Sequence, residues 1–162
     1  MPGIILIRHA ETEDSAASGG DAARSLTSRG HERMTAAARG LSRVAGELTV
    51  IAHSPLVRAV QTAQIIADRF PAARLIELPA LLPDQEPQTL LEWFAAQTGD
   101  VAVVGHEPVL SNWIGYAVAG NPRAVVHMKK SSACALEFPR PPVAGSARIR
   151  WFMDWRQLAA QA

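Results

Sequence analysis

The sequence of 162 residues is poor in cysteine, and its one cysteine is Cys134. A single thiol excludes an intramolecular disulfide framework and any zinc site built from several cysteines, and it is typical of a reducing compartment. Long hydrophobic runs are missing as well. The apolar start Ile4 to Ile7 leads directly into Arg8 and His9, and it is too short for a signal peptide or a membrane span. We therefore expect a cytoplasmic protein without a membrane partner.

Charge of one sign is not in excess either. The chain has 16 basic and 15 acidic residues, which leaves a formal net charge of +1. This balance gives no global field that attracts nucleic acid, so we expect no nucleic-acid partner, and any anion site must be local. Charged residues make up 19% and hydrophobic residues 48% of the chain. These values exclude a disordered chain and a charged coiled coil, and the length predicts one domain over residues 1–162.

Short apolar runs alternate with helical patterns along the chain. The predicted strands cover residues 3–7, 48–53, 75–78, 101–104, 133–138 and 148–152, and the predicted helices cover residues 28–44, 54–70, 89–97, 109–119 and 154–160. Thr27 or Ser28 is the expected N-cap of the first helix, and Ser54 and Pro55 are expected to begin the second. Residues 10–25, which are small and polar, are predicted to form a mobile loop. The alternation predicts a single-domain α/β fold with three layers, α/β/α, around a mostly parallel sheet.

Polar side chains follow three of the predicted strands. Arg8 and His9 come after the first strand, Ser54 and Arg58 after the second, and His106 after the fourth. Because the carboxyl ends of parallel strands form the ligand crevice of an open α/β sheet, we expect these side chains to converge. Arg58 lies in the first turn of its helix, and helical side chains lean towards the N-terminus, so its guanidinium should point into the crevice.

Such a group of side chains indicates a phosphate site. The planar fork of an arginine matches phosphoryl oxygens, and the free N–H groups at a helix start add further donors. Each of these residues alone would more often be a surface arginine or a histidine that fills a strand end. Their joint placement favours the functional interpretation.

Three sequence blocks carry a resemblance to a known family. They are Arg8-His9-Ala10-Glu11-Thr12, the segment from Ser54-Pro55-Leu56-Val57-Arg58 to Ala63, and Gly105-His106-Glu107-Pro108. In this order they resemble the histidine phosphatase superfamily, whose fold is that of phosphoglycerate mutase. The short chain, the segment Leu26-Thr27-x-x-Gly30 and the ending of the third block are most similar to the SixA-type phosphohistidine phosphatases.

The resemblance implies a phosphatase in which His9 attacks phosphorus and forms a phosphohistidine that water then hydrolyses. Arg8, Arg58 and His106 would hold the phosphoryl oxygens, together with the backbone of Glu107, and neither a metal nor another cofactor is implied. The substrate implied first is phosphohistidine on a protein. A small phosphorylated metabolite, such as a sugar or nucleotide phosphate, is the alternative, and a phosphate-binding module without catalysis is an alternative of another class.

The sequence departs from the family pattern at a few positions. Ala10 stands where a glycine is usual, and Ser15 stands where many members have an asparagine that contacts phosphate. Many members carry an acid on a long insertion after the third strand. Here only residues 79–87 are available, so Asp84 and Glu86 are the candidates for a general acid.

Several other residues that resemble functional groups have simpler interpretations. His31 and His127 are expected at the surface, and His53 is either a structural histidine or a support for the site, which the sequence leaves open. Cys134 and Arg140 have the Cys-x5-Arg spacing of cysteine-dependent phosphatases. The residues between them lack glycine and include a proline without an N–H, so they cannot wrap a phosphate, and Cys134 is predicted to be a buried strand residue.

Overall fold

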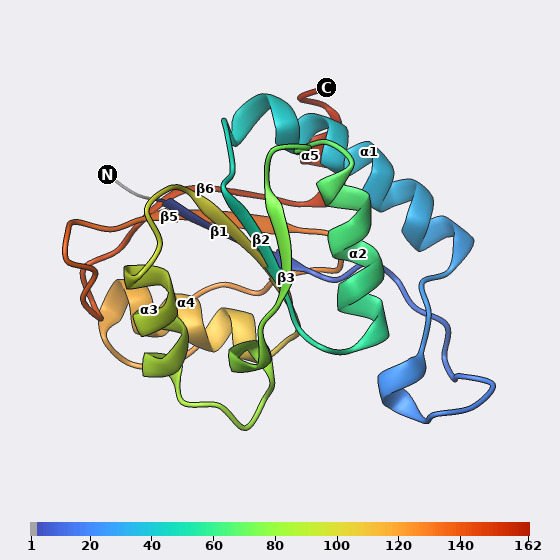
Figure 1. Cartoon of the computed structure of the whole chain (residues 1–162), viewed down its shortest axis with the longest axis horizontal. Helices are drawn as coiled ribbons and strands as arrows, with labels where there is room; N and C mark the ends of the chain where they lie inside the picture. Colours follow the sequence, from blue (N-terminus) through green and yellow to red (C-terminus); the bar gives the residue numbers. More distant parts are fainter. Residues whose placement is uncertain (1–2) are drawn as a thin grey trace.

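The computed structural model describes residues 3–162 and has six strands in one sheet. The sheet order is β3-β2-β4-β1-β5-β6 (Figure 1). The strands are β1 (Gly3–Arg8), β2 (Val50–His53), β3 (Arg74–Glu77), β4 (Val101–Gly105), β5 (Ala133–Glu137) and β6 (Arg148–Met153). Strands β1 to β4 are parallel to one another, β5 runs antiparallel to β1, and β6 runs antiparallel to β5 at the edge of the sheet. The carboxyl ends of β1, β2 and β4 therefore meet at one side of the sheet.

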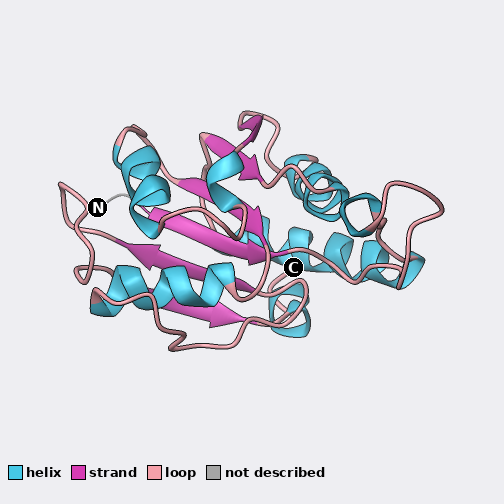
Figure 2. Cartoon of the chain, turned by 90° about the horizontal axis from the view of Figure 1, so that it is seen from below, coloured by secondary structure: helices cyan, strands magenta, loops and turns pink. Residues whose placement is uncertain are grey.

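Helices cover both faces of this sheet (Figures 1 and 2). They are α1 (Ser28–Val44), α2 (Val57–Ala67), α3 (Pro87–Ala95), α4 (Val109–Ala119) and α5 (Trp155–Ala159), with short 3-10 helices η1 (Asp21–Ala23) and η2 (Pro79–Leu81). Side chains alternate between two cores because successive strand residues point to opposite faces. Ile5 and Ile7 of β1 pack with α1, α2 and α5, whereas Ile4 and Leu6 pack with α3 and α4. The predicted three-layer fold is confirmed.

The start of α1 is packed against the chain that leaves β1. The Thr27 side chain accepts a hydrogen bond from the Gly30 amide at 2.9 Å, so Thr27 is the N-cap of the two residues considered. A Cβ atom at Gly30 would lie 2.2 Å from the carbonyl oxygen of Glu11. Glycine is required there because the helix and this backbone segment are in direct contact.

Two helix starts differ from the sequence prediction. The second helix begins at Val57, with Leu56 at the N-cap, and not at Ser54. The hydroxyl oxygen of Ser54 lies 2.5 Å from Nε2 of His106. The third helix begins at Pro87, two residues before the predicted start, because proline already has the φ angle of a first helical position.

The segment 10–25, predicted to be a mobile loop, contains local structure. Thr12 and Leu26 form an isolated antiparallel bridge, and η1 follows two glycines with positive φ, Gly19 and Gly20. Two side chains of this segment are held by neighbouring elements: Glu11 Oε1 accepts from Thr27 Oγ1 at 3.0 Å, and Asp21 Oδ2 accepts from Arg58 Nη2 at 3.2 Å. In residues 3–162, no helix is both long and apolar enough to cross a membrane.

Candidate active site

The end of β1 places a buried histidine with a defined tautomer. His9 is 5% exposed, and its Nδ1 donates a hydrogen bond to the carbonyl oxygen of Ala10 at 2.8 Å. A carbonyl can only accept, so the proton is on Nδ1 and Nε2 carries a free lone pair. Ala10 is fully buried, has a negative φ, and donates its N–H to Thr62 Oγ1 at 3.0 Å. The alanine therefore replaces the usual glycine without backbone strain.

Two arginines lie beside this histidine, and each is fixed by a carbonyl group. Arg8 Nη1 donates to the carbonyl oxygen of Met128 at 2.9 Å. Arg58, in the first turn of α2, donates from Nη1 to the carbonyl oxygen of Asp21 at 3.0 Å and from Nη2 to the Asp21 carboxylate at 3.2 Å. Both guanidinium charges lower the pKa of His9, so both are close to its ring.

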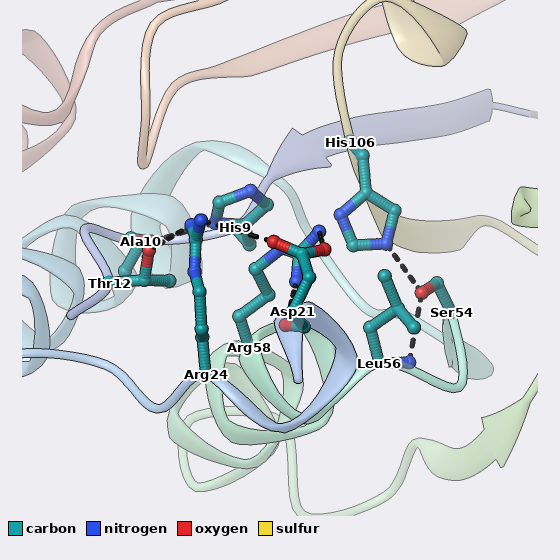
Figure 3. Close-up of polar contacts among 9 residues, drawn as sticks. All are labelled: His9, Ala10, Thr12, Asp21, Arg24, Ser54, Leu56, Arg58 and His106. Carbon is teal, nitrogen blue, oxygen red and sulfur yellow. Dashed lines mark hydrogen bonds and ion pairs between the residues drawn. The ribbon is translucent and has the colours of Figure 1, made fainter. Parts of the chain in front are cut away.

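The carboxylate of Asp21 bridges two arginines. Figure 3 shows it between Arg58 and Arg24, and Arg24 Nη1 lies 3.1 Å from Asp21 Oδ1. Arg24 in turn donates from Nη2 to Thr12 Oγ1 at 2.7 Å. The negative charge of Asp21 also opposes the lowering of the pKa of His106. A carboxylate is thus held on an arginine where a phosphoryl group would be expected.

The second histidine of the site, His106, follows β4 and is 5% exposed. Its ring centroid is 5.3 Å from that of His9, and its Nε2 is 2.5 Å from Ser54 Oγ. Ser54 Oγ also accepts the N–H of Leu56 at 3.2 Å (Figure 3), and we assign its hydroxyl proton to the bond with His106 Nε2. That arrangement leaves the ring proton on Nδ1, where it is available as a donor.

Burial makes both histidines weak bases. Burial, together with the charges of His106, Arg58 and Arg8, lowers the pKa of His9 to about 3, against the opposing effect of the hydrogen bond to Ala10. Burial, with the charges of Arg58 and Arg8, also lowers the pKa of His106 to about 4. Near pH 7 both rings are neutral. His9 Nε2 is therefore an unprotonated nucleophile at neutral pH.

Several buried donors in this cluster have no partner within residues 3–162. They are Arg8 Nε, Arg24 Nε, Arg58 Nε and His106 Nδ1. Leaving a buried donor unpaired is costly, so unpaired donors on several residues around His9 and His106 indicate a ligand with several acceptor oxygens. A tetrahedral phosphoryl group fits this requirement.

The two predicted general acids, Asp84 and Glu86, do not contact the buried histidines and arginines. Asp84 and Glu86 are exposed in the loop between η2 and α3. In residues 3–162, neither carboxylate has a hydrogen bond or ion pair with the two histidines or two arginines described above. Ser15 is also exposed. The acid that does contact an arginine of the site is Asp21, which the sequence analysis did not select.

The remaining histidines and the cysteine occupy the positions expected for structural or surface residues. His31 and His127 are exposed, whereas His53 is buried and its Nδ1 donates to the carbonyl oxygen of Ser54 at 2.9 Å. Cys134 is fully buried in β5, and burial raises the pKa of its thiol to about 12. Arg140 lies over the ring of Phe94 and not at the phosphate position. The cysteine-phosphatase interpretation is therefore wrong for this chain.

Within residues 3–162, no three histidine, cysteine or carboxylate side chains gather in a way that could hold a metal ion.

Comparison with known proteins agrees with this geometry. Residues 4–82 match the model of the histidine phosphatase superfamily (branch 1). An uncharacterized protein of Picosynechococcus is 30% identical over 159 residues, which cover 93% of this chain and 90% of that protein. The structure is similar to that of the protein histidine phosphatase SixA complexed with tungstate, with a TM-score of 0.84, 22% identity and coverage of 96% of this chain and 99% of that one. A phosphoserine phosphatase of Entamoeba histolytica in complex with 3-phosphoglyceric acid has a TM-score of 0.74, 18% identity and coverage of 98% and 100%.

Proposed function

The chain belongs to the histidine phosphatase superfamily, and we propose that it removes phosphate from phosphohistidine on proteins, without a metal, through a phosphohistidine formed on His9. One observation carries this proposal: an unprotonated, buried His9 stands beside unpaired donors of two arginines and a second histidine. The buried, unbridged Cys134 supports a cytoplasmic setting.

In the first step, the lone pair of His9 Nε2 attacks the phosphorus, and the bond from phosphorus to the substrate nitrogen breaks. Arg8, Arg58 and His106 Nδ1 stabilise the charge on the three equatorial oxygens. The amide of Glu107 is a further donor, since no hydrogen bond within residues 3–162 uses it. The two arginines supply fixed positive charge, which supports catalysis without a metal ion.

In the second step, water attacks the phosphorus of the intermediate and the P–Nε2 bond breaks. Inorganic phosphate leaves with the water oxygen, and His9 returns to its neutral form. The hydrogen bond from Nδ1 to Ala10 keeps the ring in one orientation during both steps. Phosphate and Asp21 compete for Arg58, so the carboxylate has to give up that contact when substrate binds.

The leaving group supports phosphohistidine over a phosphoester. An imidazole that is protonated on its other nitrogen departs as a neutral ring, whereas an alkoxide needs a proton from an acid. Asp84 and Glu86 remain the proposed acids for an ester, but both are exposed and neither contacts the cluster. The loop of residues 79–87 is also too short to form a large lid, which suits a residue presented by another protein.

A phosphatase for a small phosphorylated metabolite is the second candidate. The similarity to a phosphoserine phosphatase favours it, because the same fold is found in an enzyme named for a small substrate. A binding module without catalysis is a weaker alternative, since binding alone does not require a free lone pair on His9.

The proposal is tested by competition between a phosphohistidine protein and a panel of phosphorylated metabolites, compared by kcat/KM. We expect the phosphohistidine protein to be preferred, turnover to survive EDTA, and vanadate to inhibit competitively. Denaturation during turnover should trap an acid-labile phosphoenzyme. A higher kcat/KM for a sugar phosphate would replace the proposal with the metabolite phosphatase, and a strict need for added Zn²⁺ or Mg²⁺ would contradict the proposed chemistry.

A further inference from the structure

The chain has only two lysines among its 16 basic residues, and they are adjacent, Lys129 and Lys130. They lie in residues 121–132, between α4 and β5, a segment that also contains Arg123 and His127 and has no acidic residue. In a chain with a net charge of +1, this is a strong local concentration of positive charge. We call Lys129 and Lys130 the lysine pair.

Hydrogen bonds on both sides attach the lysine pair to the catalytic strand end. On one side, the carbonyl oxygen of Met128 accepts from Arg8 Nη1 at 2.9 Å, and Met128 is fully buried. On the other side, the Ser131 amide donates to the carbonyl oxygen of Arg8 at 3.1 Å. The Ser132 hydroxyl donates to the carbonyl oxygen of Lys129 at 2.5 Å. The backbone of the lysine pair is therefore fixed directly beside Arg8.

The side chains of the lysine pair are exposed, whereas those of Arg58 and His106 are buried. Among residues 3–162, neither lysine forms an ion pair. The acid that faces this segment is Glu107, whose carboxylate accepts from the Ser111 amide at 2.9 Å and lies 3.9 Å from His127 Nδ1. Glu107 is therefore already engaged, and the lysine pair is free to contact an anionic partner.

From this placement we propose that the lysine pair is a docking surface for acidic residues that flank phosphohistidine on the substrate protein. The proposal rests on the proposed function and specifies which proteins the site selects. Lysine ammonium groups are compact and hydrated, and they end a flexible side chain. They therefore suit transient contact with several carboxylates better than the rigid, planar guanidinium group of an arginine. A single small anion gains little from exposed lysines, whereas several carboxylates on one chain engage both lysines and are also steered to the site.

The test uses two synthetic phosphohistidine peptides of equal length, one with four flanking glutamates and one with four flanking glutamines. Wild type is compared with the double variant Lys129→Gln, Lys130→Gln. The matched control is Arg39→Gln, Arg43→Gln, which removes two exposed charges from α1. At low ionic strength we expect wild type to prefer the glutamate peptide by about three- to tenfold in kcat/KM, and added salt to reduce that preference.

The lysine double variant should lose the preference while keeping the wild-type kcat/KM for the glutamine peptide and for a small phosphoramidate. The arginine control should keep the preference. An equal loss on both peptides and the phosphoramidate would assign the lysines to the phosphate position and overturn the docking surface. A wild type that hydrolyses both peptides equally also overturns it. Failure of the proposed function is distinct: wild type would then hydrolyse neither peptide.

Discussion

Two groups of residues at the carboxyl edge of the sheet differ in how they are held. His9, Arg58 and His106 are 5%, 9% and 5% exposed and are fixed by the ends of buried elements. Around them, the loops carry exposed charges, such as Asp21, whose side chain is 66% exposed, and Asp84. The buried group is the proposed site of the chemistry, whereas the exposed loop charges surround it. We therefore expect substitutions in the buried group to cost far more activity than substitutions in the loops.

The largest effect is expected for His9→Ala. Removal of the proposed nucleophile should abolish turnover and the trapped phosphoenzyme, while the fold remains because His9 follows β1 and lies outside both hydrophobic cores. Turnover assays and circular dichroism measure the two parts of this prediction. The control is His127→Ala, whose side chain is 77% exposed and which should retain activity. Near-normal turnover by His9→Ala would remove the basis of the proposed mechanism.

The next largest effect is expected for Arg58→Ala. Loss of a charged donor to the transition state should reduce kcat/KM by roughly a hundredfold or more. The same loss is expected for Arg8→Ala. Steady-state kinetics with phosphohistidine and with an aryl phosphate should show it for both substrates, because the proposed mechanism has the arginines contact the phosphoryl group common to them. A loss of kcat/KM for one substrate only would mean that the arginines contact the leaving group and not the phosphoryl group.

A smaller effect is expected for Ser54→Ala, which removes the partner of His106 Nε2. The imidazole then loses the contact that fixes its tautomer, and kcat should fall by about tenfold to a hundredfold, as for other groups that orient a histidine. Nitrogen NMR of His106 should report a mixed tautomer in this variant, and Ser54→Thr should restore a single one. An unchanged NMR signature with reduced kcat would assign Ser54 a purely structural role.

The smallest kinetic effect is expected for Asp21→Asn. Because the exposed carboxylate competes with phosphate for Arg58, the inhibition constant for inorganic phosphate should fall by about two- to fivefold. Asp14→Asn is the matched control, since Asp14 is an exposed acid of the same loop and has no ion pair with an arginine of the site. Weaker phosphate binding by Asp21→Asn would instead show that Asp21 orients Arg58.

Stability should depend on pH through the two buried histidines. The pKa values of His9 and His106 are about 3 and about 4 in the folded protein, against an ordinary histidine pKa of 6.5. Between these pKa values the histidines of the unfolded chain bind protons that those of the folded chain do not. The free energy of unfolding is therefore highest above about pH 6.5, and it falls as the pH decreases. Urea unfolding at pH 7 and pH 5 measures the fall. It should be smaller for His9→Ala than for wild type, and unchanged for His127→Ala.

The fold and the buried residues of the site could be predicted from the sequence because both depend on patterns among neighbouring residues. Apolar runs mark the strands, and Arg8, His9 and His106 follow them directly, so their convergence is a consequence of parallel strands. The prediction that Ser54 meets the other polar side chains at the strand ends agrees with its contact to His106, whereas its predicted role as a helix N-cap was wrong. A serine before a proline has the local signature of a helix start, and only tertiary structure shows that its hydroxyl contacts a residue 52 positions away.

Asp21 could not have been selected from the sequence for a related reason. It lies in a loop without periodicity, 37 positions before the arginine it contacts. Gly19 and Gly20 indicate a turn but not its direction. The contact depends on how the chain between β1 and α1 packs on α2, which composition does not specify.

The burial of Cys134 has a practical consequence for measurements on this protein. Its thiol is fully buried, and its raised pKa of about 12 keeps it in the unreactive, protonated form at neutral pH. A maleimide dye added to the folded protein should therefore find no target. A cysteine introduced at Lys129 would be the one accessible thiol, so a single fluorophore could be attached beside Arg8 and used to follow the arrival and departure of a substrate protein in real time.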